Sequence, residues 1–162
     1  MTQMLASPDL TSNSQPAEGL AQLREVLAVS GLKAGLAFLN QRVPHRFTAV
    51  YRLQDGNMHN RDIVDKQDAV VPDELLCVPF QDSFCQFVLR DGGFVTARSG
   101  EDPRLAGHAY QGILLSYVGL PLSSGEALLA GTLCHFDFDA REVEDAEYAF
   151  LQQAALCISQ YL

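Results

Sequence analysis

Four cysteines, Cys77, Cys85, Cys134 and Cys157, are the residues of this sequence with the greatest capacity for chemistry. A cysteine thiolate can act as a nucleophile, a redox group or a metal ligand. None of the spacings between them forms the Cys-x-x-Cys pair of zinc or thioredoxin-type sites. Each cysteine also lies among apolar neighbours, as in the Leu-Cys-Ile sequence around Cys157. The pattern therefore predicts reduced, buried thiols that pack as small hydrophobic side chains.

His135 and Asp137 are a second candidate for chemistry, because alternate residues of a strand share one face. Two such side chains could begin a metal site, but no third ligand lies at a recognisable spacing. The sequence also contains no Gly-x-Ser-x-Gly elbow, no His-Glu-x-x-His motif and no glycine-rich phosphate loop. We therefore predict no metal site and no catalytic residues, and no residue pattern identifies a cofactor.

Three amphipathic helices are predicted from apolar residues that recur at three- and four-residue steps. They cover residues 17–30, 32–41 and 142–162. Gly31 and Pro44 end the first two, and acidic residues begin the third, where the helix dipole favours negative charge. Residues 1–16 are polar and lack periodicity, so we expect a flexible arm there, followed by a single domain over residues 17–162.

Two hairpins are predicted as well. Residues 47–53 and 57–64 flank Asp55-Gly56, a favoured tight turn. The apolar runs 113–122 and 127–136 are separated by Ser-Ser-Gly-Glu, so we expect them to pair as inner strands. The remaining segments are predicted as a loop (65–74), a short helix (83–89), a short strand (94–97) and a long connection (99–112) that suggests a ligand-covering loop. An antiparallel sheet faced by helices, an α+β domain, is the simplest packing of this order.

The charge and hydropathy of the chain exclude several classes of partner. With 20 acidic residues against 11 Lys and Arg, the net charge of -9 would repel nucleic-acid phosphates and anionic lipid headgroups. No apolar run approaches the length of about 20 residues that spans a bilayer. The N-terminus has neither the basic start nor the apolar block of a secretory signal, which predicts a cytoplasmic location.

Four ordered segments in the second half of the chain resemble landmarks of bacterial GAF domains. They are Pro79-Phe80-Gln81-Asp82-Ser83-Phe84-Cys85, Glu101-Asp102-Pro103-Arg104-Leu105, Tyr117-Val118-Gly119-Leu120-Pro121-Leu122 and Gly131-Thr132-Leu133-Cys134-His135-Phe136-Asp137. With the flanking helices, the resemblance covers roughly residues 20–162. One departure is the segment after the last landmark, Asp137-Phe138-Asp139-Ala140-Arg141, where many relatives read Asp-x-x-Pro-Arg. This difference suggests a looser turn.

The resemblance implies a central antiparallel sheet of about six strands, with the N- and C-terminal helices on one face and a ligand-type pocket on the other. It also implies a small-molecule ligand, a homodimer formed through the terminal helices and a signalling protein as partner. The residues that would line the pocket are Phe80, Ser83, Phe84, Cys85, Asp102, Arg104, His108, Tyr110, Tyr117, Thr132, Cys134 and Phe136.

Plainer structural roles compete with ligand binding at several of these positions. Thr132, Cys134 and Phe136 share a strand face and could simply fill the core. Asp102 and Arg104 could pin their own loop through a local ion pair.

The resemblance favours a small-molecule-sensing or regulatory domain in signal transduction. The alternative is a cysteine-dependent enzyme or redox sensor that resembles free methionine sulfoxide reductase. That branch uses cysteines around the pocket, and residues 99–112 contain none. A covalently attached bilin would need a cysteine in the same region. An enzyme is therefore the less favoured interpretation.

Overall fold

The computed structural model describes the backbone of residues 7–123 and 129–162, and the side chains of these ranges from residue 16 onward. The helices are α1 (Ser7–Ser30), α2 (Leu32–Asn40), α3 (Cys85–Asp91) and α4 (Asp145–Ile158). The strands are β1 (Phe47–Gln54), β2 (Asn57–Asp65), β3 (Cys77–Pro79), β4 (Phe94–Thr96), β5 (Ser116–Ser123) and β6 (Leu129–Asp137).

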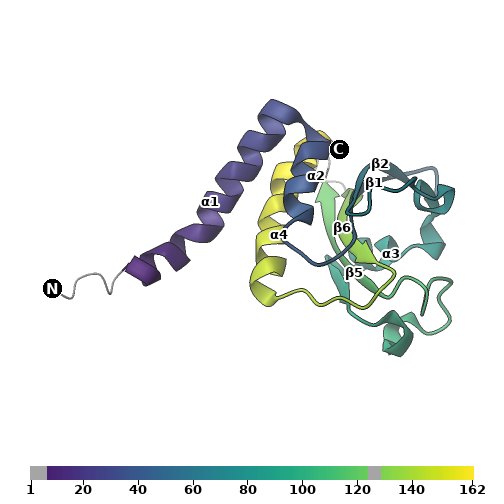
Figure 1. The fold of residues 1–162 in the computed structure, drawn as a ribbon. Coiled ribbons are helices and arrows are strands. Elements are labelled where there is room, and N and C mark those ends of the chain that lie inside the picture. Colours follow the sequence, from purple (N-terminus) through teal and green to yellow (C-terminus); the bar gives the residue numbers. More distant parts are fainter. Residues whose placement is uncertain (1–6, 124–128) are drawn as a thin grey trace.

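The strands form one antiparallel sheet of six strands in the order β3-β2-β1-β6-β5-β4 (Figure 1). The two hairpins predicted from the sequence, β1–β2 and β5–β6, are both present, and β5 and β6 lie at inner positions. Direct pairing of β1 with β6 joins the two hairpins through the register Phe47↔Phe136 to Arg52↔Gly131. The predicted α+β fold is therefore confirmed.

Strand alternation divides the inner strands between two cores. On β6, Leu133 belongs to the core under the terminal helices, whereas Cys134 and Phe136 belong to the core on the opposite face. On β5, Val118 belongs to the core under the terminal helices, and Tyr117 belongs to the core on the opposite face. The period of two along a strand produces this separation, so each inner strand contributes to both layers.

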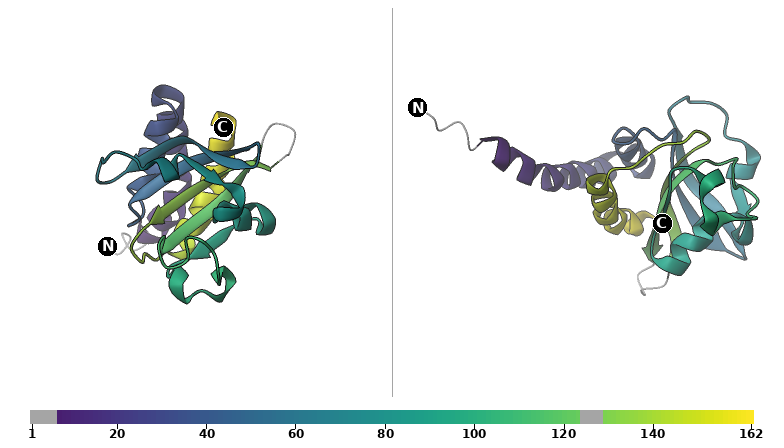
Figure 2. Two further views of the ribbon diagram at one scale, coloured as in Figure 1. Left: turned by 90° about the vertical axis from the view of Figure 1, so that its right-hand side faces the viewer. Right: turned by 90° about the horizontal axis from the view of Figure 1, so that it is seen from below.

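Helices α1, α2 and α4 cover one face of the sheet, and α3 lies on the other together with the loops (Figures 1 and 2). Leu23 and Leu27 of α1, together with Leu36 of α2, are almost fully buried in the helical layer. Gly35 allows these helices to approach closely, because a Cβ there would overlap the side chain of Leu27. Apolar burial of this kind is the main force that holds the helices on the sheet.

The β1–β2 turn follows the sequence prediction. Asp55 and Gly56 have φ angles of 54° and 78°, as a two-residue turn with two left-handed residues requires. Glycine adopts such a φ without steric cost, and aspartate tolerates it better than most residues.

The sequence predictions missed the start of α1 and the strand β3. Helix α1 begins at Ser7 and contains Pro16, so the predicted flexible arm is helical over residues 7–16, and residues 1–6 lie outside the described part. β3 was not predicted, because a strand of three residues is too short to show alternation. Most of the predicted Ser123 to Glu126 turn also lies outside the described residues.

Cys77 is a further correction, because it is exposed whereas the other three cysteines are buried. It lies on the edge strand β3, whose outward residues face solvent. No helix in the described ranges is both long enough and apolar enough to cross a membrane.

Candidate ligand-binding cavity

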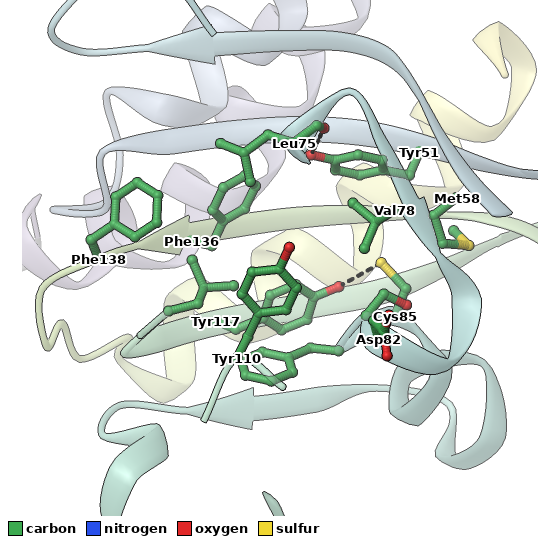
Figure 3. A pocket seen from close by; sticks show the side chains of 13 residues that line it. Tyr51, Met58, Leu75, Val78, Asp82, Cys85, Tyr110, Tyr117, Phe136 and Phe138 are labelled. Atoms are coloured by element: carbon green, nitrogen blue, oxygen red, sulfur yellow. Dashed lines mark hydrogen bonds between the residues drawn. The ribbon is translucent and has the colours of Figure 1, made fainter. Parts of the chain in front are cut away.

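The sheet face opposite the terminal helices carries a small cavity. Its lining comes from β1, β2, β3, β5 and β6, from α3, from the loops before β3, α3 and β5, and from the turn after β6 (Figure 3). Helix α3 ends at Gly92, whose φ of 83° is the left-handed conformation that closes a helix. This tight ending turns the chain directly into β4 and keeps α3 against the sheet.

The cavity has a volume of about 50 Å³. Its lining is dominated by aromatic and aliphatic side chains. The lining residues are Tyr51, Met58, Leu75, Val78, Asp82, Ser83, Phe84, Cys85, Tyr110, Leu114, Tyr117, Phe136 and Phe138. A volume above about 15 Å³ accommodates a water molecule, whereas pockets for drug-sized ligands measure about 300–1,000 Å³. The cavity described is therefore large enough for water molecules but smaller than such ligand pockets.

Cys85, Tyr117 and Thr132 form a buried polar contact at the edge of the cavity. The Cys85 sulfur lies 3.3 Å from the Tyr117 hydroxyl and 3.3 Å from the Thr132 hydroxyl. Gly119 makes room for the Tyr117 ring, because a Cβ there would lie 2.6 Å from a ring carbon of Tyr117. These polar groups therefore satisfy one another, and each is buried.

The two cavity tyrosines that are fully buried remain protonated. Burial raises the pKa of Tyr51 and the pKa of Tyr117 well above their ordinary values. The Tyr51 hydroxyl donates a hydrogen bond of 2.7 Å to the carbonyl oxygen of Leu75, which ties β1 to the loop before β3.

The environment of the two thiols disfavours the thiolate form. Burial raises the pKa of Cys85, although hydrogen bonds from Thr132 and Tyr117 oppose the effect. Burial likewise raises the pKa of Cys134 well above its ordinary value, and its sulfur contacts the carbonyl oxygen of Ala49 at 3.7 Å. Activated thiols normally have a lowered pKa, so neither sulfur has the environment of a reactive nucleophile.

Asp102 and Arg104 hold their own loop instead of facing the cavity. Asp102 accepts hydrogen bonds from the Arg104 backbone N–H and side chain at 2.6 to 3.0 Å. Arg104 also donates to the carbonyl oxygen of Val95 at 2.6 Å and stacks over the Phe94 ring. The hydrogen bonds from Arg104 lower the pKa of Asp102 to about 2. The pair therefore anchors the 99–112 loop to β4.

His108 lies beside the cavity lining and is not part of it. Its ring packs against Phe84 and Phe87, with centroid separations of 4.8 and 5.8 Å. Its Nδ1 accepts a hydrogen bond from the backbone N–H of Tyr110, which helps to position that tyrosine. His108 is thus a neighbour that orients a lining residue.

Six of the residues predicted from the sequence line the cavity: Ser83, Phe84, Cys85, Tyr110, Tyr117 and Phe136. The other six lie outside its lining: Phe80, Asp102, Arg104, His108, Thr132 and Cys134. Thr132 and Cys134 do share the face of Phe136, as alternation predicts, but they lie in the core beneath the lining.

The sequence prediction missed seven lining residues: Tyr51, Met58, Leu75, Val78, Asp82, Leu114 and Phe138. Alternation along β1 places Tyr51 on the same face as Phe47, so the sequence alone could have indicated that Tyr51 lies on the cavity side of the sheet. Leu75 and Val78 reach the cavity only because β3 pairs with β2, and nothing local in the sequence indicates that pairing.

His135 and Asp137 lie on the helical side of β6, where they have structural partners. Asp137 accepts hydrogen bonds from the backbone N–H groups of Arg46 and Asp139, both at 2.9 Å, and pairs with Arg141 at 3.1 Å. The turn after β6 is therefore anchored by Asp137, in spite of the departure from the family pattern. Across the described residues, no group of three potential metal ligands lies together.

A scan of protein-family models and a search of curated proteins give no match. Among solved structures, the chain is similar to the GAF domain of an Acinetobacter phosphoenolpyruvate-protein phosphotransferase, with a TM-score of 0.72 and 11% identity over 91% of this chain and 92% of that chain. It is also similar to a free methionine-R-sulfoxide reductase from Neisseria meningitidis, with a TM-score of 0.70 and 16% identity over 90% and 87% of the two chains. A GAF domain from Coxiella burnetii gives a TM-score of 0.69 at 15% identity over 90% and 91%. Identity at this level establishes the fold alone, and the fold of this chain is that of the GAF domain.

Proposed function

We propose that this chain is a regulatory GAF-type domain that senses a small molecule in the cavity between the sheet and α3. The observation that carries the proposal is the cavity itself, which lies on the face away from the helical layer and is lined by side chains from five strands, from α3 and from the loops between them (Figure 3). Ligand pockets are typically concave and apolar with few polar groups, as this one is. The sheet would transmit occupancy to the helices, because each inner strand contributes to both cores.

Native mass spectrometry tests ligand binding after incubation of the protein with a cell extract. A bound molecule that is lost on denaturation is expected for the wild-type chain. Val78→Phe places a ring in the cavity and is expected to abolish the bound species, whereas Val78→Ala is expected to retain it. A bound species that persists in Val78→Phe would contradict the cavity as the binding site, and no bound species at all would favour a purely scaffolding role.

The proposal includes a homodimer formed through α1 and α4. Val29 near the end of α1 and Leu156 in the last turn of α4 expose 77% and 68% of their surface, which places them among the most exposed large apolar side chains of the described residues. Light scattering at high concentration is expected to give twice the monomer mass, and the double variant Val29→Glu, Leu156→Glu is expected to give the monomer. A strictly monomeric wild-type protein would remove this part of the proposal.

A thiol-dependent reductase is the alternative, because a cysteine lines the cavity and some of the similar structures are methionine sulfoxide reductases. The raised pKa of Cys85 and Cys134 disfavours it. Consumption of free methionine sulfoxide by the purified chain in the presence of dithiothreitol, which supplies the two electrons for each turnover, with loss of turnover in Cys85→Ala, would support the reductase over the sensor.

A further inference from the structure

The polar groups of the cavity are nearly all engaged with the protein itself. Tyr51 donates to Leu75, and the Cys85 sulfur contacts the hydroxyls of Tyr117 and Thr132. The Ser83 hydroxyl donates to the carbonyl oxygen of Phe80 at 2.8 Å. A ligand that required several hydrogen bonds would have to break these internal contacts, and each buried group left unpaired opposes binding.

The cavity also offers no counter-charge for a buried ion. Asp82 is the one charged residue among the lining side chains, and it is exposed at the mouth. Among the described residues, no Lys, Arg or His is part of the cavity lining, so a carboxylate or phosphate would enter without a partner. Because an unpaired charge in an apolar site is strongly disfavoured, the lining selects against ions. The net charge of -9 further disfavours anions.

One hydroxyl group remains available to form a hydrogen bond with a ligand. Tyr110 is half-buried, its hydroxyl points into the cavity in Figure 3, and that hydroxyl makes no hydrogen bond to the residues described. A phenol hydroxyl can both donate and accept, so it could pair with one alcohol, amide or carbonyl group. The other walls present the aromatic faces and edges of Phe84, Phe136 and Phe138.

The same tyrosine lies on the segment best placed to admit a ligand. Gly107 and Gly112 bracket it with φ angles of 81° and 78°. Neither glycine has a neighbouring atom within 4 Å of the position that a Cβ would occupy. The chain reverses at each end of this segment and leaves open space beside each glycine, so residues 107–112 could move if the hydrogen bonds from the Gly112 backbone N–H to Ser99 and from Gln111 to the Asp102 carbonyl oxygen broke, while Asp102 and Arg104 hold the preceding loop. Such a movement would enlarge the 50 Å³ cavity toward the size of a ligand.

We infer that the cavity binds a small uncharged molecule with an apolar, ring-sized body and at most one hydrogen-bonding group, which pairs with the Tyr110 hydroxyl. This inference rests on the proposed sensing function and names the chemical class of its ligand. It excludes amino acids, nucleotides and other ionic metabolites from the site.

A methyl NMR experiment with matched probes tests the inference. The chain contains 3 methionines, and the two other than Met58 precede α1 in the sequence, so methyl-labelled methionine gives a specific probe of the cavity. Met58→Leu assigns the signal. The probes are toluene, benzyl alcohol, benzylammonium and benzoate, which share one ring and differ in polarity and charge.

Toluene and benzyl alcohol are expected to shift the Met58 signal in a saturable manner through the ring current, and the two ions are expected to leave it unchanged. Val78→Ala should tighten the binding of both neutral probes, and Val78→Phe should abolish it. Tyr110→Phe should weaken the binding of benzyl alcohol by about 3- to 10-fold, which is the effect of one lost hydrogen bond, and should leave the affinity for toluene unchanged.

Two outcomes would overturn the inference, and they differ in whether the cavity remains a binding site. If benzoate or benzylammonium shifts Met58 with an affinity equal to or greater than that of the neutral probes, the ligand class is wrong while the cavity remains a binding site. If no probe reaches Met58 in the wild-type chain or in Val78→Ala, the cavity is packed core and the sensing proposal fails with the inference.

Discussion

At the scale of single residues, burial decides the chemistry of the cysteines. Apolar neighbours in the sequence predicted four buried thiols, and the structure confirms this for Cys85, Cys134 and Cys157. Cys77 has the same kind of neighbours, but it lies on the outward side of an edge strand. The local sequence cannot distinguish the two cases, because exposure depends on what packs against the strand.

Thiol labelling of the native protein checks this difference. Iodoacetamide at neutral pH is expected to modify Cys77 rapidly and the other three cysteines only slowly, because a protected thiol must first be exposed and ionised. Peptide mass spectrometry measures the order of modification, and the protein unfolded in denaturant, where all four should react, is the control. Labelling of Cys85 or Cys134 as fast as Cys77 would restore the thiol enzyme as a candidate.

At the scale of elements, the 99–112 loop is ordered by its own polar contacts. Asp102 caps the 3₁₀ turn Pro103–Leu105 by accepting from the Arg104 backbone N–H, and Ser99 accepts from the backbone N–H of Gly112 at 2.9 Å. The plainer structural role considered for Asp102 and Arg104 therefore agrees with their geometry. These contacts hold the loop that positions Tyr110 over the cavity.

Replacement of Asp102 measures the contribution of this anchor. Asp102→Ala is expected to lower the free energy of unfolding by about 1 kcal/mol, the usual value of a lost cap, because the ion pair with the exposed Arg104 adds little. Urea denaturation gives the value. Glu101→Ala, on the exposed neighbouring residue, is the matched control and should change stability by less than about 0.5 kcal/mol. Equal effects of the two substitutions would contradict the anchoring role.

At the scale of the whole molecule, a buried polar cluster joins α2, β1 and β6 at one end of the sheet. Asn40 donates to the Thr48 hydroxyl, and Thr48 in turn lies 2.6 Å from Nδ1 of His135. The Thr48 hydroxyl can accept from Asn40 and still either donate to or accept from Nδ1 of His135, so the histidine tautomer sets the direction of that hydrogen bond. Nε2 of His135 and both ring nitrogens of His45 are buried without a partner in the described structure. Both histidines are fully buried, and their rings lie 6.0 Å apart.

The two histidines make the folded state sensitive to mild acid. Burial lowers the pKa of His45 to about 4 despite the nearby Asp137, and burial lowers the pKa of His135 to about 3, with His45 and Lys66 acting in the same direction. In the unfolded chain both histidines titrate near pH 6.5. Between pH 6.5 and the lowered pKa values of the folded state, the unfolded chain therefore binds more protons than the folded chain. The stabilisation is therefore complete above about pH 6.5 and is lost as the pH falls.

We expect a loss of about 2 kcal/mol for each of these histidines between pH 7 and pH 5, measured by urea denaturation across that range. His45→Phe keeps a ring in place and should roughly halve the loss. His59→Gln, away from the cluster, is the control. Asp65 and Asp102 also have a lowered pKa, but the stability that they contribute is present above about pH 4 and is lost only below it. A free energy of unfolding that did not change between pH 7 and pH 5 would show that the folded state does not keep these histidines neutral.

The sequence by itself determined the order of the elements other than β3, the two hairpins and the face on which each inner strand residue lies. These features follow from local periodicity and turn chemistry, as the alternation of Leu133, Cys134 and Phe136 illustrates. The ends of elements were less accessible. Residues 7–16 extend α1 although their composition indicated a flexible arm, and no apolar pattern marks them.

Only the tertiary structure decided which residues meet at the cavity. Half of the predicted pocket residues line it; the landmark segments contain five of these six, and Tyr110 comes from the 99–112 loop. Leu75 and Val78 reach the cavity through the β2–β3 pairing, and Phe138 reaches it through the turn anchored by Asp137. Such positions depend on contacts between segments that are distant in the sequence. A local sequence pattern does not indicate the free energies of those contacts.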